Sequence, residues 1–145
     1  MRYIPLGSTD VMITDYCLGT MTWGSQTPED DAHRQMDMAL AAGINIVDTA
    51  EMYPVNPVKA ETIGDTEVIL GNWNAANRAR RGDYVLATKH AGKNGSFVRP
   101  GQDITGATFA ACVDASLKRL QTDYIDVYQL HWPNRGSYHF RQGWN

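Results

Sequence analysis

Four short apolar segments alternate with helical segments along this chain, and this alternation restricts its fold more than any other feature. The apolar segments cover residues 16–20, 44–47, 84–88 and 124–130. Strands that alternate with helices form parallel sheets with right-handed crossovers, so we predict an α/β fold. Residues 3–6 and 11–13 flank a Gly-Ser-Thr-Asp turn, which indicates a β-hairpin before the first of these strands.

Three helices are predicted between the strands. The first has Thr27 as its capping residue, Pro28 at its first helical position and Gly43 just past its end. The second and third are predicted over residues 65–76 and 105–120, where apolar residues recur at helical spacing. Their apolar faces comprise Val68, Ile69 and Trp73 in the second helix, and Phe109, Val113, Leu117 and Leu120 in the third.

The composition excludes several classes of function. The 145 residues suffice for one ordinary domain, and a content of 43% hydrophobic and 20% charged residues is typical of soluble globular proteins. A net charge of −3 gives no electrostatic basis for binding nucleic acid or an anionic membrane. No apolar run approaches the roughly 18 residues of a membrane span, and no signal peptide is visible. We therefore expect a cytoplasmic protein.

The cysteines and histidines do not indicate a metal site. Cys17 and Cys112 have neither metal-ligand spacing nor a disulfide framework, so we expect both to be buried, reduced thiols. No pair of histidines has metal-ligand spacing supported by a third ligand, and we predict no bound metal.

Ionisable residues lie where three successive strands end. Asp48 follows the strand at 44–47, Lys89 follows the strand at 84–88, and His131 follows the strand at 124–130. The carboxyl ends of parallel strands meet at one edge of a sheet, where the active sites of such folds lie. Tyr53 comes five residues after Asp48. We therefore expect Asp48, Tyr53, Lys89 and His131 to converge in one concave site.

These four side chains together indicate general acid catalysis. A free phenol has a pKa near 10, and a neighbouring ammonium lowers that pKa. Lys89 could activate Tyr53 in this way, Asp48 would hold Lys89, and His131 could donate a hydrogen bond to a carbonyl oxygen. Such a site suits carbonyl reduction in which the hydride comes from elsewhere. Taken singly, each residue also has an ordinary structural interpretation.

The motifs that contain these residues resemble those of the aldo-keto reductase family, and within it the bacterial Tas-like members. The matching segments are Leu-Gly-Thr-Met-Thr-Trp-Gly from Leu18, Ala-Gly-Ile-Asn from Ala42, Asp-Thr-Ala-Glu-Met-Tyr from Asp48, Ala-Thr-Lys from Ala87, Ser-Leu-Lys-Arg-Leu-Gln-Thr-Asp-Tyr from Ser116, and His-Trp-Pro from His131. The resemblance covers nearly the whole chain.

This resemblance implies a (β/α)8 barrel, closed at its bottom by the N-terminal hairpin, that reduces aldehydes or ketones with NADPH. By the same match Tyr53 is the proton donor, Lys89 and Asp48 tune it, and His131 orients the carbonyl. Trp23 and Trp132 would line the substrate pocket. The backbone at Thr20 and Met21, together with Asp48, would lie near the nicotinamide.

The chain is expected to hold only the N-terminal half of such a barrel. Residues 1–145 supply the hairpin, four strands and three helices, whereas an eight-unit barrel at this strand spacing needs roughly 300 residues. The C-terminal half, which carries the family's main dinucleotide contacts, is expected to be absent. The chain also has no G-x-G-x-x-G motif.

Two other interpretations stay open at this point. Lys89 could instead be a Schiff-base nucleophile in an aldolase-like barrel. Alternatively, the chain could be a non-catalytic interaction module, because a half barrel exposes two sheet edges and an apolar face through which it could associate with itself.

Overall fold

The computed structural model describes residues 1–93, 98–99 and 102–134. Within these residues the chain forms a two-stranded hairpin followed by alternating strands and helices. The elements are β1 (Tyr3–Pro5), β2 (Met12–Thr14), β3 (Leu18–Gly19), α1 (Glu29–Ala41), β4 (Ile46–Asp48), α2 (Asp65–Ala76), β5 (Val85–His90), α3 (Gly106–Leu120) and β6 (Val127–Leu130), with short 3₁₀ helices at Ala60–Thr62 and Arg78–Asp83.

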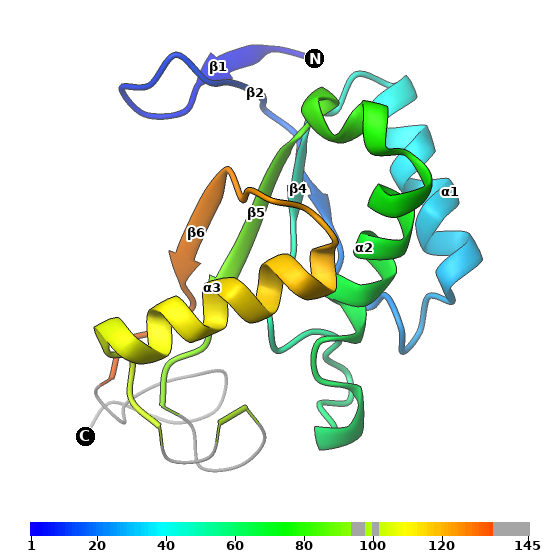
Figure 1. The fold of residues 1–145 in the computed structure, drawn as a ribbon. Helices are drawn as coiled ribbons and strands as arrows, with labels where there is room; N and C mark the ends of the chain where they lie inside the picture. Colours follow the sequence, from blue (N-terminus) through cyan, green and yellow to red (C-terminus); the bar gives the residue numbers. More distant parts are fainter. Residues whose placement is uncertain (94–97, 100–101, 135–145) are drawn as a thin grey trace.

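Strands β3 to β6 form one parallel sheet in the order β3-β4-β5-β6. The register pairs Gly19 with Asp48, Asp48 with Ala87, and Lys89 with Gln129. Strands β1 and β2 pair antiparallel as a separate hairpin. Figure 1 shows the hairpin beyond the amino ends of the sheet strands, with the three helices on one side of the sheet. The predicted parallel α/β arrangement and the hairpin are therefore confirmed.

The main core lies between the sheet and helices α1 and α2. Its buried residues come from α1, α2, β4, β5 and the end of α3, and from the segments just before α1 and β5. They are Trp23, Ala32, Met36, Val47, Ile69, Leu70, Trp73, Tyr84, Leu86 and Leu120. Strand β5 is buried along its whole length, as expected for a strand with neighbours on both edges.

Helix α1 begins one residue later than the sequence predicts. Pro28 is its N-cap residue, with extended backbone and no side-chain cap, and the helix starts at Glu29. The Thr27 hydroxyl lies 3.1 Å from the Thr22 hydroxyl, so it takes part in the preceding turn rather than capping the helix. Acidic residues in the first turn complement the helix dipole in the absence of a side-chain cap.

Helices α2 and α3 approach each other very closely at Gly71. A Cβ atom at Gly71 would lie 1.9 Å from the carbonyl oxygen of Arg119, so only glycine permits this packing. The predicted bounds of α2 are confirmed, but Val68 is exposed although it was assigned to the apolar face. Helix α3 starts with Thr105 as N-cap, in a capping box with Thr108.

A separate polar network holds the amino ends of β5 and β6. Arg81 donates to Asp126 at 2.8 Å and to the carbonyl oxygens of Tyr84 and Tyr124. Asp126 also accepts the backbone N–H of Leu86 at 2.8 Å. We call this group the Arg81 network, and it joins the two strand ends opposite the predicted site.

The two thiols differ in exposure. Both are free, and Cys112 is buried in α3, whereas Cys17 is exposed just before β3. The expectation that Cys17 is buried is therefore wrong, since the short strand β3 lies at an edge of the described sheet. Among the described residues, no helix is both long enough and apolar enough to cross a membrane.

Candidate active site

Lys89 and Asp48 form an ion pair at the carboxyl ends of two neighbouring strands. The Lys89 ammonium lies 2.6 Å from Asp48 Oδ2 and donates a second hydrogen bond to the carbonyl oxygen of Thr49 at 2.7 Å. The side chain of Lys89 is 11% exposed and that of Asp48 32%. Parallel pairing of β4 with β5 brings together these two residues, which are 41 positions apart in the chain.

Tyr53 and His131 lie against this ion pair. The Lys89 ammonium is 5.0 Å from the centroid of the Tyr53 ring. The rings of Tyr53 and His131 are 5.7 Å apart in an edge-to-face arrangement, with planes inclined by 76°. Both side chains are half-buried. The structure therefore brings Asp48, Tyr53, Lys89 and His131 together, as their positions in the sequence predict.

The pKa of Tyr53 does not shift in the expected direction. Burial first, and then the negative charge of Asp48, raise the pKa of Tyr53 to about 12. Lys89 donates to Asp48 and to a carbonyl oxygen, and its ammonium lies over the phenol ring. The carboxylate therefore offsets the positive charge that was expected to stabilise the phenolate. In this structure Tyr53 is a neutral phenol that holds its proton.

His131 is also neutral at pH 7. Burial and then the positive charge of Lys89 lower the pKa of His131 to about 4. Its Nδ1 atom is buried and has no hydrogen-bond partner among the described residues. A neutral imidazole can donate one hydrogen bond to an uncharged acceptor, such as a carbonyl oxygen.

The residues assigned to the nicotinamide lie next to Asp48. Thr20 is buried, and both its backbone N–H and its hydroxyl donate to the carbonyl oxygen of Asp48. Met21 follows it and is exposed. The Gln129 amide donates to Asp48 Oδ1 at 3.4 Å, a long hydrogen bond. The sequence analysis did not identify Gln129 as a site residue, although it lies in β6, two residues before His131.

The two tryptophans assigned to the substrate pocket have different surroundings. Trp132 packs beside His131, with ring centroids 4.9 Å apart, in a small cluster with Ala91 and Val98. Trp23 instead lies in the main core, 1% exposed, and its indole N–H donates to Gln35. The Trp23 side chain is therefore buried in the core with residues of α1 and α2, and it does not face an open pocket as expected.

Two charged residues that sequence analysis missed lie behind the site. Glu51, between Asp48 and Tyr53, is 4% exposed and pairs with Arg99. His90 and Cys112 are also buried here, and ligand atoms of Glu51, His90 and Cys112 lie within 4.8 Å of one another. Their types suit a metal. However, Arg99 already supplies the positive charge beside Glu51, and burial and then Glu51 raise the pKa of Cys112 to about 11, which disfavours the thiolate that a metal requires.

Comparison with known proteins identifies the class to which this fold and site belong. The sequence model of the aldo/keto reductase family matches residues 16–142, which is most of the chain. The chain belongs to the aldo/keto reductase family.

Two bacterial proteins are among the similar relatives. Protein tas of Escherichia coli K12 is 44% identical over 138 residues, which cover 93% of this chain and 39% of that protein. The uncharacterized oxidoreductase YrpG of Bacillus subtilis is 39% identical over 138 residues, which cover 93% of this chain and 41% of that protein. The resemblance to Tas noted from the motifs is therefore confirmed.

A solved structure matches the fold. An aldo-keto reductase from Bacillus halodurans, in its holo form, superposes with a TM-score of 0.71 at 35% identity. The match covers 90% of this chain and 40% of that structure. The chain thus spans about 40% of the length of the relatives it matches, and its parallel sheet and helices are consistent with part of an α/β barrel.

Proposed function

We propose that this protein is an oxidoreductase that reduces an aldehyde or ketone with NADPH, and that Tyr53 donates the proton. The observation that carries the proposal is that Tyr53 lies close to both the Lys89–Asp48 ion pair and the neutral ring of His131. Membership of the aldo/keto reductase family supports it. NADPH would supply the hydride when bound.

The described residues fit the nicotinamide end of such a cofactor. Among the residues that the structure describes, Asp48 Oδ1 receives only the long hydrogen bond from Gln129, so these side chains offer an acceptor and a donor for a carboxamide group. The described residues at this edge of the sheet offer less to the phosphate groups of the cofactor, because two of the cations there already pair with carboxylates. Arg99 is paired with Glu51, and Lys93 lies 3.6 Å from Asp103. Asp48, Gln129 and the backbone at Thr20 and Met21 would hold the nicotinamide.

In the proposed reaction the substrate oxygen accepts two hydrogen bonds. One comes from the neutral imidazole of His131 and the other from the Tyr53 hydroxyl. As negative charge develops on that oxygen, the Tyr53 proton moves to it, and the Lys89 ammonium stabilises the phenolate that forms. At neutral pH Tyr53 keeps its proton until that moment, as any phenol whose pKa lies well above 7 does.

Substitution of Tyr53 tests the proposal. The chain would be joined to the C-terminal part of the E. coli relative to complete the barrel, and NADPH oxidation measured with an aldehyde. Tyr53→Phe should lower kcat by about 10²–10⁴-fold, the usual contribution of general acid catalysis, with little change in NADPH affinity. Tyr16→Phe, which alters an exposed phenol, is the matched control. Near-normal turnover by Tyr53→Phe would refute the role of Tyr53.

The Schiff-base alternative has less support. A nucleophilic lysine must lose its proton, whereas the Lys89 ammonium is held by a carboxylate at 2.6 Å and by a backbone carbonyl oxygen at 2.7 Å. Borohydride trapping of a carbonyl substrate on Lys89 would revive this alternative.

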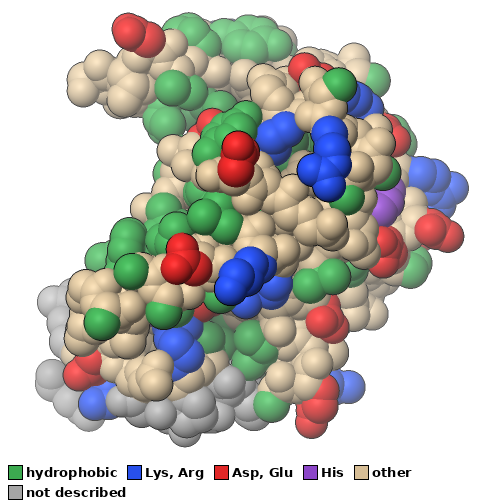
Figure 2. Space-filling view, viewed as in Figure 1, with side chains coloured by type: hydrophobic (Ala, Val, Ile, Leu, Met, Phe, Trp, Pro, Cys, Tyr) green, Lys and Arg blue, Asp and Glu red, His purple; other side chains and the backbone are tan. Residues whose placement is uncertain are grey.

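We further propose that the 145-residue chain by itself binds NADPH weakly, lacks appreciable reductase activity and associates with itself. Within the described residues, β6 pairs only with β5, and Leu130 on this edge strand is 56% exposed. Figure 2 shows hydrophobic side chains along this flank, beside a hollow beneath the hairpin. Exposed apolar edge strands favour association.

The oligomeric state of the purified chain tests this second proposal. Light scattering during size-exclusion chromatography should give a mass above the 16.1 kDa of one chain. Leu130→Lys should shift the mass toward that of a monomer, because a charge on the edge strand opposes pairing. A monomer that reduces aldehydes at ordinary enzyme rates would overturn the proposal. A cytoplasmic location stays a prediction.

A further inference from the structure

Glu51 connects two loops at the carboxyl edge of the sheet. It lies in the segment between Asp48 and Tyr53, and both of its carboxylate oxygens have partners in the chain that follows β5. Oε1 accepts the backbone N–H of Ala91 at 2.6 Å, and Oε2 pairs with Arg99 Nη1 at 2.5 Å. A buried carboxylate with both oxygens bonded holds its neighbours in a fixed geometry.

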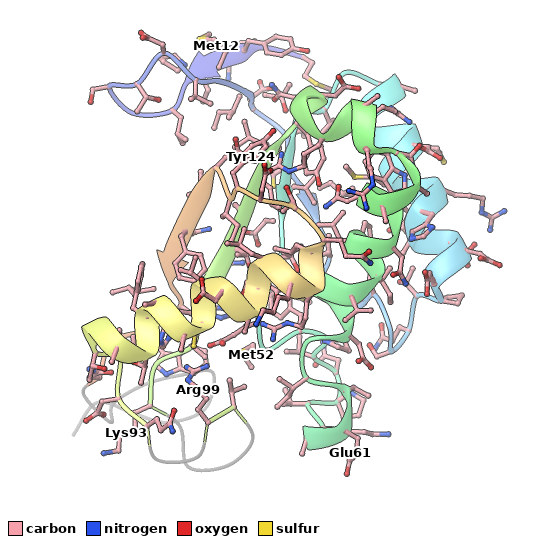
Figure 3. All side chains as sticks on the ribbon, viewed as in Figure 1. Met12, Met52, Glu61, Lys93, Arg99 and Tyr124 are labelled. Atoms are coloured by element: carbon pink, nitrogen blue, oxygen red, sulfur yellow. The ribbon has the colours of Figure 1, made fainter. Side chains whose placement is uncertain are left out.

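Arg99 completes a closed set of bonds. Its Nη2 donates to the carbonyl oxygen of Ala91 at 2.6 Å, so Ala91 is held on both sides. We call Glu51, Ala91 and Arg99 the Glu51 clamp. Figure 3 shows Arg99 at the same end of the molecule as Met52, whereas Tyr124 lies at the opposite end of the strands.

The clamp lies next to the residues that carry the proposed chemistry. Tyr53 follows Glu51 by two residues, and its backbone N–H donates to Ala50 in the same turn at 3.1 Å. The Glu51 backbone N–H donates to the carbonyl oxygen of Lys89 at 3.3 Å. The clamp therefore joins the segment that carries Tyr53 to the strand end that carries Lys89.

We propose that Glu51 is a positioning residue, whose bonds to Ala91 and Arg99 fix the Tyr53 ring against His131 and Lys89. This proposal rests on the proposed function for its catalytic consequence, but the positioning itself does not need activity. Displacement of a catalytic group by about 1 Å can lower a rate by about 10²-fold, so a clamp beside the proton donor bears directly on catalysis.

The test measures the position of Tyr53 in the folded 145-residue chain. The Tyr53 ring shifts the proton resonances of the neighbouring His131 ring through its ring current. The His131 resonance would be assigned among the four histidines with His131→Gln. The Tyr53 contribution is then the difference between the wild type and Tyr53→Leu. We expect Glu51→Gln to remove most of this difference at a temperature where the protein is fully folded.

Asp126→Asn is the matched control. It removes a carboxylate of similar kind from the Arg81 network, whose bonds lie at the opposite ends of β5 and β6. We expect it to lower stability while leaving the His131 resonance in place. A resonance that moves equally in both variants would mean that Glu51 has only a general structural role, and would overturn the proposal.

Arg99→Lys provides a second test if Glu51→Gln does not fold. Lysine keeps a positive charge near Glu51, but one nitrogen replaces the two that bridge Glu51 and Ala91. Part of the Tyr53 contribution should therefore be lost, and full retention in a folded variant would contradict the clamp.

Activity in the completed barrel separates this inference from the proposed function. There Glu51→Gln should lower kcat by about 10²-fold with less change in KM. If Tyr53→Phe leaves turnover normal while Glu51→Gln still removes the Tyr53 contribution to the His131 resonance, the proposed function is wrong and the positioning role of Glu51 is supported. If the spectrum is unchanged by Glu51→Gln, the clamp fails whatever the activity.

Discussion

The ammonium group of Lys89 lies over the aromatic face of Tyr53, 5.0 Å from the ring centroid, and at the same time bonds to Asp48. The cation is attracted to the ring face, yet Asp48 offsets its charge. Burial first, and then the charge of Asp48, raise the pKa of Tyr53, the tyrosine that family resemblance indicates as the proton donor. Binding of a ligand against Asp48 would change this balance.

Asp48→Asn tests the influence of the Asp48 carboxylate on the pKa of Tyr53. Removing the carboxylate removes the charge that, after burial, contributes to raising the pKa of Tyr53. The pKa of Tyr53 should therefore fall from about 12 toward its ordinary value. The measurement is absorbance titration of the phenolate, with Tyr53→Phe in each background to isolate the Tyr53 signal. An unchanged or higher midpoint would contradict the proposed influence of Asp48.

His131 should make stability depend on pH. Its pKa is lowered from 6.5 to about 4, so between these values the unfolded chain binds a proton that the folded chain does not. The free energy of unfolding should therefore fall as pH decreases from about 6.5 to about 4. Urea denaturation at several pH values would measure this. His131→Gln should show a weaker dependence over that range, and an identical profile would refute the assignment to His131.

Gly71→Ala should destabilise the fold. The added Cβ would lie 1.9 Å from the carbonyl oxygen of Arg119, so α2 and α3 must separate. Overpacking of this kind costs roughly 1–3 kcal/mol of unfolding free energy, occasionally more. Gly82→Ala is the matched control, because nothing lies within 4 Å of its added Cβ, and its effect should stay within about 0.5 kcal/mol. Equal unfolding midpoints for the two variants would contradict the close approach.

The positions of the strands and helices could be predicted from the sequence because they depend on local patterns, although α1 begins one residue later than predicted and β5 continues through His90. Apolar runs that end at Asp48, Lys89 and His131 identify the strands, and the parallel sheet then brings those ends to one edge. The bounds of α2 follow from periodicity in the same way.

The environment of individual side chains could not be predicted in this way. The motif around Trp23 predicts a residue that lines the substrate pocket. Its side chain is instead buried in the core, because of the way in which the helices pack against it. Glu51 and Arg99 are 48 positions apart, and no periodicity relates them. The pKa of Tyr53 depends on its burial and then on the nearby charge of Asp48, and only the three-dimensional arrangement defines both.

The two ends of β5 are held by different polar groups. The Arg81 network holds its amino end, and the Glu51 clamp adjoins its carboxyl end. Because the two sets of bonds are separate, the effect of a random substitution should depend on which end of β5 it lies near. Changes near Arg81 should lower the yield of folded protein, whereas changes near Glu51 should leave folded protein that performs its chemistry poorly. Evolution could therefore alter substrate preference at one end of the sheet while the other end preserves the fold.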